Sequence, residues 1–83
     1  MLDNLQAGEK VIGVKQSRRA VRDGLAKLVF LAYDADPALT EPIEGQCSEK
    51  EIPVVKEFSM KQLGQAAGIH VGAAVVALLQ EIC

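Results

Sequence analysis

The feature that most constrains this chain is an uninterrupted apolar run from Leu28 to Tyr33. The run is rich in residues that favour strands and is too short to be a separate helix. A strand without polar residues in alternation has both of its faces covered, so it belongs in the middle of a sheet. A chain of 83 residues has room for one domain, and we expect that domain to span residues 1–83.

Segments of two kinds alternate along the rest of the chain. Strands are expected at residues 11–14, 28–33, 52–55 and 74–79, and helices at residues 2–6, 16–24, 37–40, 41–50 and 60–67. For residues 74–79, periodicity alone also permits an apolar helix. Strands that alternate with helices predict an α/β fold, a three-layer α/β/α sandwich around a mixed four-stranded sheet.

Two helix starts carry clear capping signals. Asp36 is expected to cap a helix that has Pro37 in its first position, where the missing N–H has no partner to lose. Pro42 is expected to divide this region into one turn and a second helix. Further on, the segment 59–62 is a capping box, and Gly68 is the expected terminator of the helix that follows it.

The cysteines and the single histidine do not form a metal site. Cys47 and Cys83 have no metal-ligand spacing, and His70 adds only one further nitrogen ligand. Cys47 continues a buried helical stripe that begins with Leu39 and Ile43, so we expect it to be a free core thiol in a reducing compartment.

The net charge of −2 conceals an uneven distribution. Residues 1–27 carry six Lys and Arg against three acids, whereas residues 28–83 carry three against eight. In the first part, Lys15, Arg18 or Arg19, and Arg22 fall on one helical face at the start of a helix, where the backbone also favours anions. Two interpretations stay open: a solvated charged face, or a surface that binds phosphate.

A second candidate is the loop 68–72, in which Ile69, His70 and Val71 stand between two glycines. Glycine permits a tight path that would lift Ile69 and Val71 to the surface, where they could contact an unstacked base. The alternative is that both side chains turn back into the core. His70 has no partner in any catalytic motif and is expected on the surface.

Nothing in the sequence predicts an enzyme or a cofactor. Asp34 and Asp36 fit turn and capping roles, and neither a Walker loop nor a GxGxxG motif occurs. The longest apolar run, 73–79, is far shorter than the ~20 residues of a membrane span. We therefore expect a non-enzymatic protein of the cytoplasm without metal or cofactor.

Three segments together resemble a known family. They are residues 12–21 (IGVKQSRRAV), residues 34–37 (DADP) and residues 63–74 (LGQAAGIHVGAA). In this order and spacing they are similar to the ribosomal L7Ae family, in particular to its small bacterial members of the YbxF type, over residues 4–80.

The resemblance implies binding to kink-turn RNA, a duplex bent at a bulge that is flanked by sheared G·A pairs, in ribosomal or other structured RNA. The family's guanine-contacting helix start falls on Gly13, Lys15, Gln16 and Arg19, with Lys15 in place of the usual Asn and Gln16 in place of Glu. Its apolar loop falls on residues 69–71. The whole predicted RNA-binding set is Gly13, Val14, Lys15, Gln16, Arg18, Arg19, Arg22, Ile69, His70 and Val71.

A second hypothesis has the same fold and a different partner. In it, the basic helix start contacts an acidic protein of a ribonucleoprotein and Ile69 and Val71 provide an apolar anchor. The two hypotheses differ in whether one RNA motif is preferred and in how binding depends on salt. In either case we expect the chain to be a monomer.

Overall fold

The computed structural model describes residues 9–80 of the chain. Its four-stranded sheet has the order β1-β4-β2-β3, with β4 antiparallel to both neighbours and β3 parallel to β2. The elements follow the order β1 (Lys10–Ile12), α2 (Val14–Arg22), β2 (Ala26–Leu31), α3 (Pro37–Glu49), β3 (Val54–Val55), α4 (Met60–Ala67) and β4 (Val75–Leu79). The helix expected at residues 2–6 lies outside the described residues.

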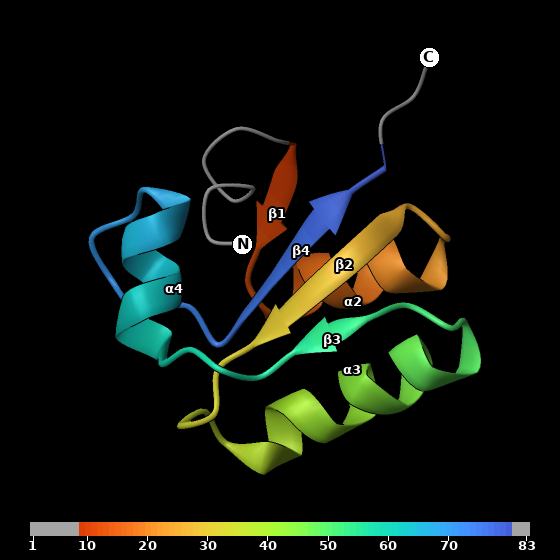
Figure 1. The fold of residues 1–83 in the computed structure, drawn as a ribbon, viewed down its shortest axis with the longest axis horizontal. Helices are drawn as coiled ribbons and strands as arrows, with labels where there is room; N and C mark the ends of the chain where they lie inside the picture. Colours follow the sequence, from red (N-terminus) through yellow and green to blue (C-terminus); the bar gives the residue numbers. More distant parts are fainter. Residues whose placement is uncertain (1–8, 81–83) are drawn as a thin grey trace.

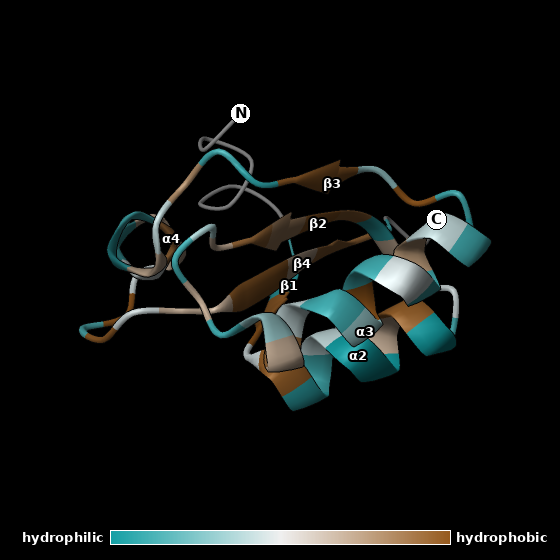
Figure 2. Ribbon diagram, turned by 90° about the horizontal axis from the view of Figure 1, so that it is seen from below, coloured by the Kyte–Doolittle hydropathy of each residue, from teal (hydrophilic) through white to brown (hydrophobic). Residues whose placement is uncertain are grey.

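The helices cover both faces of the sheet (Figures 1 and 2). Helices α2 and α3 lie side by side on one face and α4 lies on the other. Because successive side chains of a strand point to opposite faces, Val29 of β2 is buried beneath α2 and α3, while its neighbour Phe30 packs with Leu63 of α4. The predicted three-layer sandwich and its mixed sheet are confirmed.

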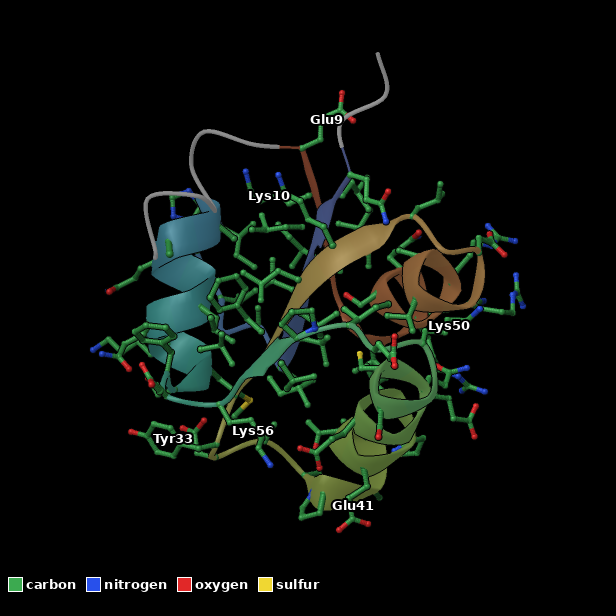
Figure 3. The ribbon with its side chains drawn as sticks, turned by 45° about the vertical axis from the view of Figure 1, so that its right-hand side comes forward. Glu9, Lys10, Tyr33, Glu41, Lys50 and Lys56 are labelled. Carbon is green, nitrogen blue, oxygen red and sulfur yellow. The ribbon has the colours of Figure 1, made fainter. Side chains whose placement is uncertain are left out.

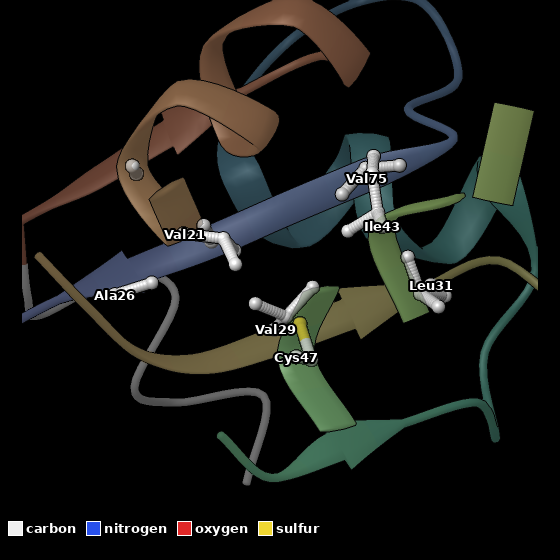
Figure 4. Close-up of a cluster of buried hydrophobic side chains, with 9 residues drawn as sticks. Val21, Ala26, Val29, Leu31, Ile43, Cys47 and Val75 are labelled. Carbon is white, nitrogen blue, oxygen red and sulfur yellow. The ribbon is translucent and has the colours of Figure 1, made fainter. Parts of the chain in front are cut away.

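The core beneath α2 and α3 is built from aliphatic side chains and one thiol (Figure 4). Val21 of α2, together with Ile43 and Cys47 of α3, packs against Val29 and Val75 of the sheet, and all of these residues are fully buried. At roughly 1.5–3 kcal/mol for each buried aliphatic side chain, this layer is a main source of stability. Figure 2 shows the hydrophilic sides of both helices turned away from the sheet.

Strand β2 is central, as predicted, but it lies two residues earlier than the apolar run. Its pairing with β4 skips a residue between Ala26 and Leu28, so Lys27 falls in an irregularity and remains exposed. Such a bulge lets one polar residue occupy a central strand without being buried. Tyr33 lies beyond the end of the strand and is 66% exposed.

The prediction that Pro42 divides the third helix was wrong, because α3 is continuous through this residue. Proline removes one N–H of the helical ladder, and Pro42 lies on the exposed side. Burial of Ile43 and Cys47 against the sheet holds the two parts together. The predicted cap is confirmed, since the Asp36 side chain accepts a hydrogen bond from the N–H of Ala38 at 2.9 Å.

Two leucines near the ends of helices are exposed, and one of them, Leu39, belongs to the stripe that the sequence predicts to be buried. Leu39 in the first turn of α3 and Leu25 beyond the end of α2 are each 44% exposed. The same stripe of α3 is fully buried from Ile43 onward.

The strand expected at residues 11–14 is shorter than predicted: β1 ends at Ile12, because Gly13 and Val14 begin α2. The start and end of α4 were predicted correctly. Both hydrogen bonds of the capping box between Ser59 and Gln62 are present, and Gly68 ends α4 in the left-handed conformation with φ 82°. The segment 74–79 forms a strand rather than a helix. The expected strand at residues 52–55 is reduced to Val54–Val55, because Pro53 joins the sheet only through its carbonyl oxygen, which accepts from Val29 N–H at 3.1 Å.

Cys47 provides a test of this packing. Its side chain is fully buried and free of a disulfide, burial raises the pKa of the thiol, and the Glu44 carboxylate raises this pKa further. Since the thiolate is the reactive form, Ellman's reagent should label Cys47 in the native protein only as fast as the protein unfolds. The measurement uses C83S, which leaves one thiol, and rapid labelling without denaturant would contradict the buried position.

Candidate nucleic-acid interface

The start of α2 is shaped by a glycine. Gly13 follows β1 with φ 105° and ψ 159°, a conformation that is open almost only to glycine. Its N–H donates to the carbonyl oxygen of Val75 at 2.9 Å, which joins the start of α2 to the start of β4. No side chain caps the helix, and its first turn contains no acid. The first backbone N–H groups therefore remain available to an anion.

The exposed face of α2 is basic, as predicted. Ser17, Ala20 and Val21 face the core, whereas Lys15, Gln16, Arg18, Arg19 and Arg22 are exposed. Arg22 pairs with its neighbour Asp23 at 3.3 Å. Within residues 9–80, no carboxylate lies within ion-pair distance of the other cations of this face. This surface carries positive charge that the described part of the protein does not neutralise.

A hollow of ≈ 550 Å³ runs along this face. Helix α2 provides most of its lining, and α3 contributes a single residue, Gln46. The lining residues are Val14, Lys15, Gln16, Arg18, Arg19, Arg22 and Gln46. Sequence reasoning missed Gln46 because this residue belongs to another helix, although its place beside the buried Cys47 was a usable signal. The structure thus brings together every predicted site residue of α2 except Gly13.

The loop between α4 and β4 separates its two apolar residues. Ile69 is half-buried and packs on the core beneath α4, and its N–H donates to Gly64 at 3.0 Å. Val71 is 71% exposed and His70 is also exposed. Each of the two alternatives left open by the sequence holds for one residue: Ile69 turns toward the core and anchors the loop, whereas Val71 forms its exposed apolar tip.

The end of the loop and the start of α2 lie at the same end of the sheet (Figure 1). Strands β1 and β2 end here and β4 begins here. The bond from Gly13 N–H to Val75 and the 2.9 Å bond from Ala32 N–H to the carbonyl of Ala74 attach the end of the loop to both neighbouring strands. The two predicted parts of the site, the start of α2 and the loop, are distant in sequence. They therefore lie at the same end of the sheet, on its opposite faces.

The aspartates at this end of the sheet have structural roles. Asp34 accepts a hydrogen bond from the N–H of Met60 at 2.8 Å and so positions the start of α4, while Asp36 caps α3. No group of three or more potential metal ligands occurs within residues 9–80. In the same range, no helix is long and apolar enough to cross a membrane. Tyr33, which precedes Asp34 in the chain, has its ring turned away from the sheet (Figure 3).

The chain belongs to the ribosomal protein L7Ae/L30e/S12e/Gadd45 family, whose sequence model matches residues 3–83. The RNA-binding protein YbxF of Geobacillus stearothermophilus is 49% identical over 76 residues, which are 92% of this chain and 93% of the relative. An RNA-binding protein of Geobacillus thermodenitrificans is 47% identical over the same length and share of each chain.

Among solved structures, the 15.5kD RNA binding protein of Giardia lamblia matches with a TM-score of 0.90. Its sequence is 27% identical, and the match covers 96% of this chain and 71% of that one. The relatives named here are described as RNA-binding proteins and not as enzymes.

The packing of the loop on α4 can be tested at Gly64. A Cβ atom at this position would lie 2.1 Å from the backbone oxygen of Val71 and 3.1 Å from Cα of Gly72. Gly64→Ala must displace the loop backbone and should lower the free energy of unfolding by about 1–3 kcal/mol or more. Chemical denaturation measures the change.

The matched control is Gly45→Ala in α3, where nothing lies within 4 Å of the added Cβ. Because alanine favours helix, this change should raise the free energy of unfolding by up to about 1 kcal/mol. Equal effects of the two substitutions would contradict the close approach of the loop to α4.

Proposed function

We propose that this protein binds kink-turn RNA through the basic start of α2 and the tip of the loop between α4 and β4. The observation that carries the proposal is the uncapped helix start with Lys15, Arg18 and Arg19 exposed and unpaired within the described residues. RNA binding is also what the names of the relatives state.

The start of α2 has the chemistry to contact both bases and backbone. Lys15 and Arg19 donate hydrogen bonds, and guanine presents two acceptors, O6 and N7, on its major-groove edge. Gln16 can donate and accept, and so can contact an adenine or guanine edge. The free N–H groups and Arg18 favour phosphate. This division assigns base contacts to Lys15, Gln16 and Arg19, and phosphate contacts to the free N–H groups and Arg18.

The loop offers a different contact. Val71 presents an exposed apolar surface at the same end of the sheet, and Ile69 supports the loop from the core. An apolar tip gains most from a base that has left its stack. His70 is exposed beside it and can add a polar or stacking contact.

The position of these two parts favours a bent RNA. The major groove of a regular A-form duplex is too deep and narrow for side chains to contact its bases. A bulge interrupts the helix, frees a base and exposes neighbouring base edges. A ligand that presents guanine edges to α2 and an unstacked base to Val71 therefore needs such an interruption, as a kink-turn provides.

The protein is further proposed to act as a monomer in the cytoplasm, on ribosomal or other structured RNA. The monomer is supported by the edge strand β3, which is only Val54–Val55 long and is flanked by Pro53 and Lys56. A short edge with proline and lysine beside it discourages pairing with a second sheet.

Fluorescence energy transfer tests the main proposal. Dyes on the two arms of a kink-turn RNA should come closer on titration with the protein, because binding stabilises the bent form. The control is the same RNA with its G·A pairs changed to Watson–Crick pairs, which should bind much more weakly. Equal binding to both RNAs would reduce the interaction to electrostatics and favour the hypothesis of an acidic protein partner.

Two arginines of α2 should behave differently. Arg19→Ala removes a base contact and should cost on the order of 1–3 kcal/mol on the kink-turn, with a smaller cost on the control RNA. Arg22→Ala, one turn further, should weaken binding to both RNAs alike and reduce the salt slope by about one unit. Calorimetry at several salt concentrations provides both quantities.

Lys56→Ala is the control for loss of a single cation, since the exposed Lys56 follows the edge strand β3, away from α2, and pairs with Glu44 of α3 (Figure 3). It should leave kink-turn affinity nearly unchanged. If Arg19→Ala weakened both RNAs by the same factor, α2 would be an electrostatic surface without base recognition.

A further inference from the structure

We propose that Gln46 of α3 is a further RNA-contacting residue, whose amide oxygen accepts a hydrogen bond from a ribose 2′-hydroxyl. This inference rests on the RNA binding proposed above and extends the contact surface from α2 to a second helix. In this proposal, the sugar-phosphate backbone of one RNA arm lies in the hollow beside α2. The contact with the 2′-hydroxyl lets the protein distinguish RNA from DNA.

The first observation is the composition of the hollow. Its α2 side carries the cations Lys15, Arg18, Arg19 and Arg22, and its α3 side is formed by a neutral amide, Gln46. The cations match phosphate oxygens, which only accept hydrogen bonds. A volume of ≈ 550 Å³ lies within the range of sites that hold a small ligand, so it is large enough for a backbone segment.

The second observation is that Gln46 Oε1 is buried and has no hydrogen-bond partner in the described structure. An unpaired buried carbonyl lowers the stability of a folded protein, and such groups are uncommon enough to need an explanation. Ser17 Oγ is likewise buried without a partner, so this hydroxyl does not satisfy the amide. A ligand that supplies a donor would remove the cost.

The identity of that donor follows from the chemistry of the two walls. When the α2 cations hold phosphates, the group that adjoins each phosphate is a ribose, whose 2′-hydroxyl both donates and accepts. DNA has no donor at this position. The Gln46 residue is only partly buried and lines the hollow. The proposed contact therefore requires the amide to rotate, so that its buried oxygen turns toward the hollow when RNA binds.

The test is a double-mutant cycle between protein and RNA. Wild-type protein and Gln46→Met are titrated with a kink-turn RNA and with copies that carry a single 2′-deoxy substitution at successive positions. At one position, loss of the hydroxyl should weaken wild-type binding about threefold to tenfold. Gln46→Met should weaken binding to the unmodified RNA by a similar factor and be insensitive to the deoxy substitution at that position.

Gln65→Met is the matched control, because Gln65 is an exposed glutamine of α4 on the other face of the sheet. It should bind every RNA of the series like the wild type. Gln46→Met should melt at the same temperature as the wild type or higher, because methionine leaves no buried carbonyl unpaired.

Failure of this inference is distinct from failure of the proposed function. Wild-type protein that prefers the kink-turn but is indifferent to every 2′-deoxy substitution overturns the role of Gln46, whatever the variant does. Additive effects of Gln46→Met and the deoxy substitution at every position also overturn it. Wild-type protein without preference for the kink-turn overturns the proposed function instead.

Discussion

The structure depends on burying both faces of two central strands, β2 and β4. Phe30 and Val29 are neighbours in β2, yet one is buried beneath α4 and the other beneath α2 and α3. Neither face can be left to water without exposing a continuous apolar surface, so the helices are placed on both sides. With β2 and β4 in the centre of the sheet, the short strands β1 and β3 take the edges.

That arrangement also decides where the candidate interface lies. Strand β4 begins at the edge where β1 and β2 end, so the loop that precedes β4 and the helix that follows β1 meet there. The bond from Gly13 to Val75 joins them through backbone atoms, which hold position more rigidly than long side chains. The basic side chains of α2 are flexible, but the helix that carries them is fixed to the sheet. A site that recognises bases requires such a rigid backbone.

Positive and negative charges are separated between the two helices on this face of the sheet. The basic residues of α2 lie beside α3, whose outward residues include Glu41, seen at the start of this helix in Figure 3. Negative charge on α3 would repel a phosphate backbone, so under the proposed function RNA is expected on the side of α2. The net charge of −2 limits unspecific attraction elsewhere. Gln46 is a neutral residue on the side of α3 that borders the hollow, so it lies where the basic surface of α2 ends.

The sequence by itself determined most of the elements, the central place of β2, the caps at Asp36 and Ser59, and the basic face of α2, but it left open whether residues 74–79 form a strand. These follow from local periodicity and from hydrogen bonds between near neighbours in the chain, which need no knowledge of the rest. Only the tertiary structure decided that α3 runs through Pro42, that Ile69 is anchored while Val71 is exposed, and that Gln46 faces α2. Each of these depends on contacts between segments distant in the chain, where burial outweighs local preference and no spacing along the sequence records which side chains meet.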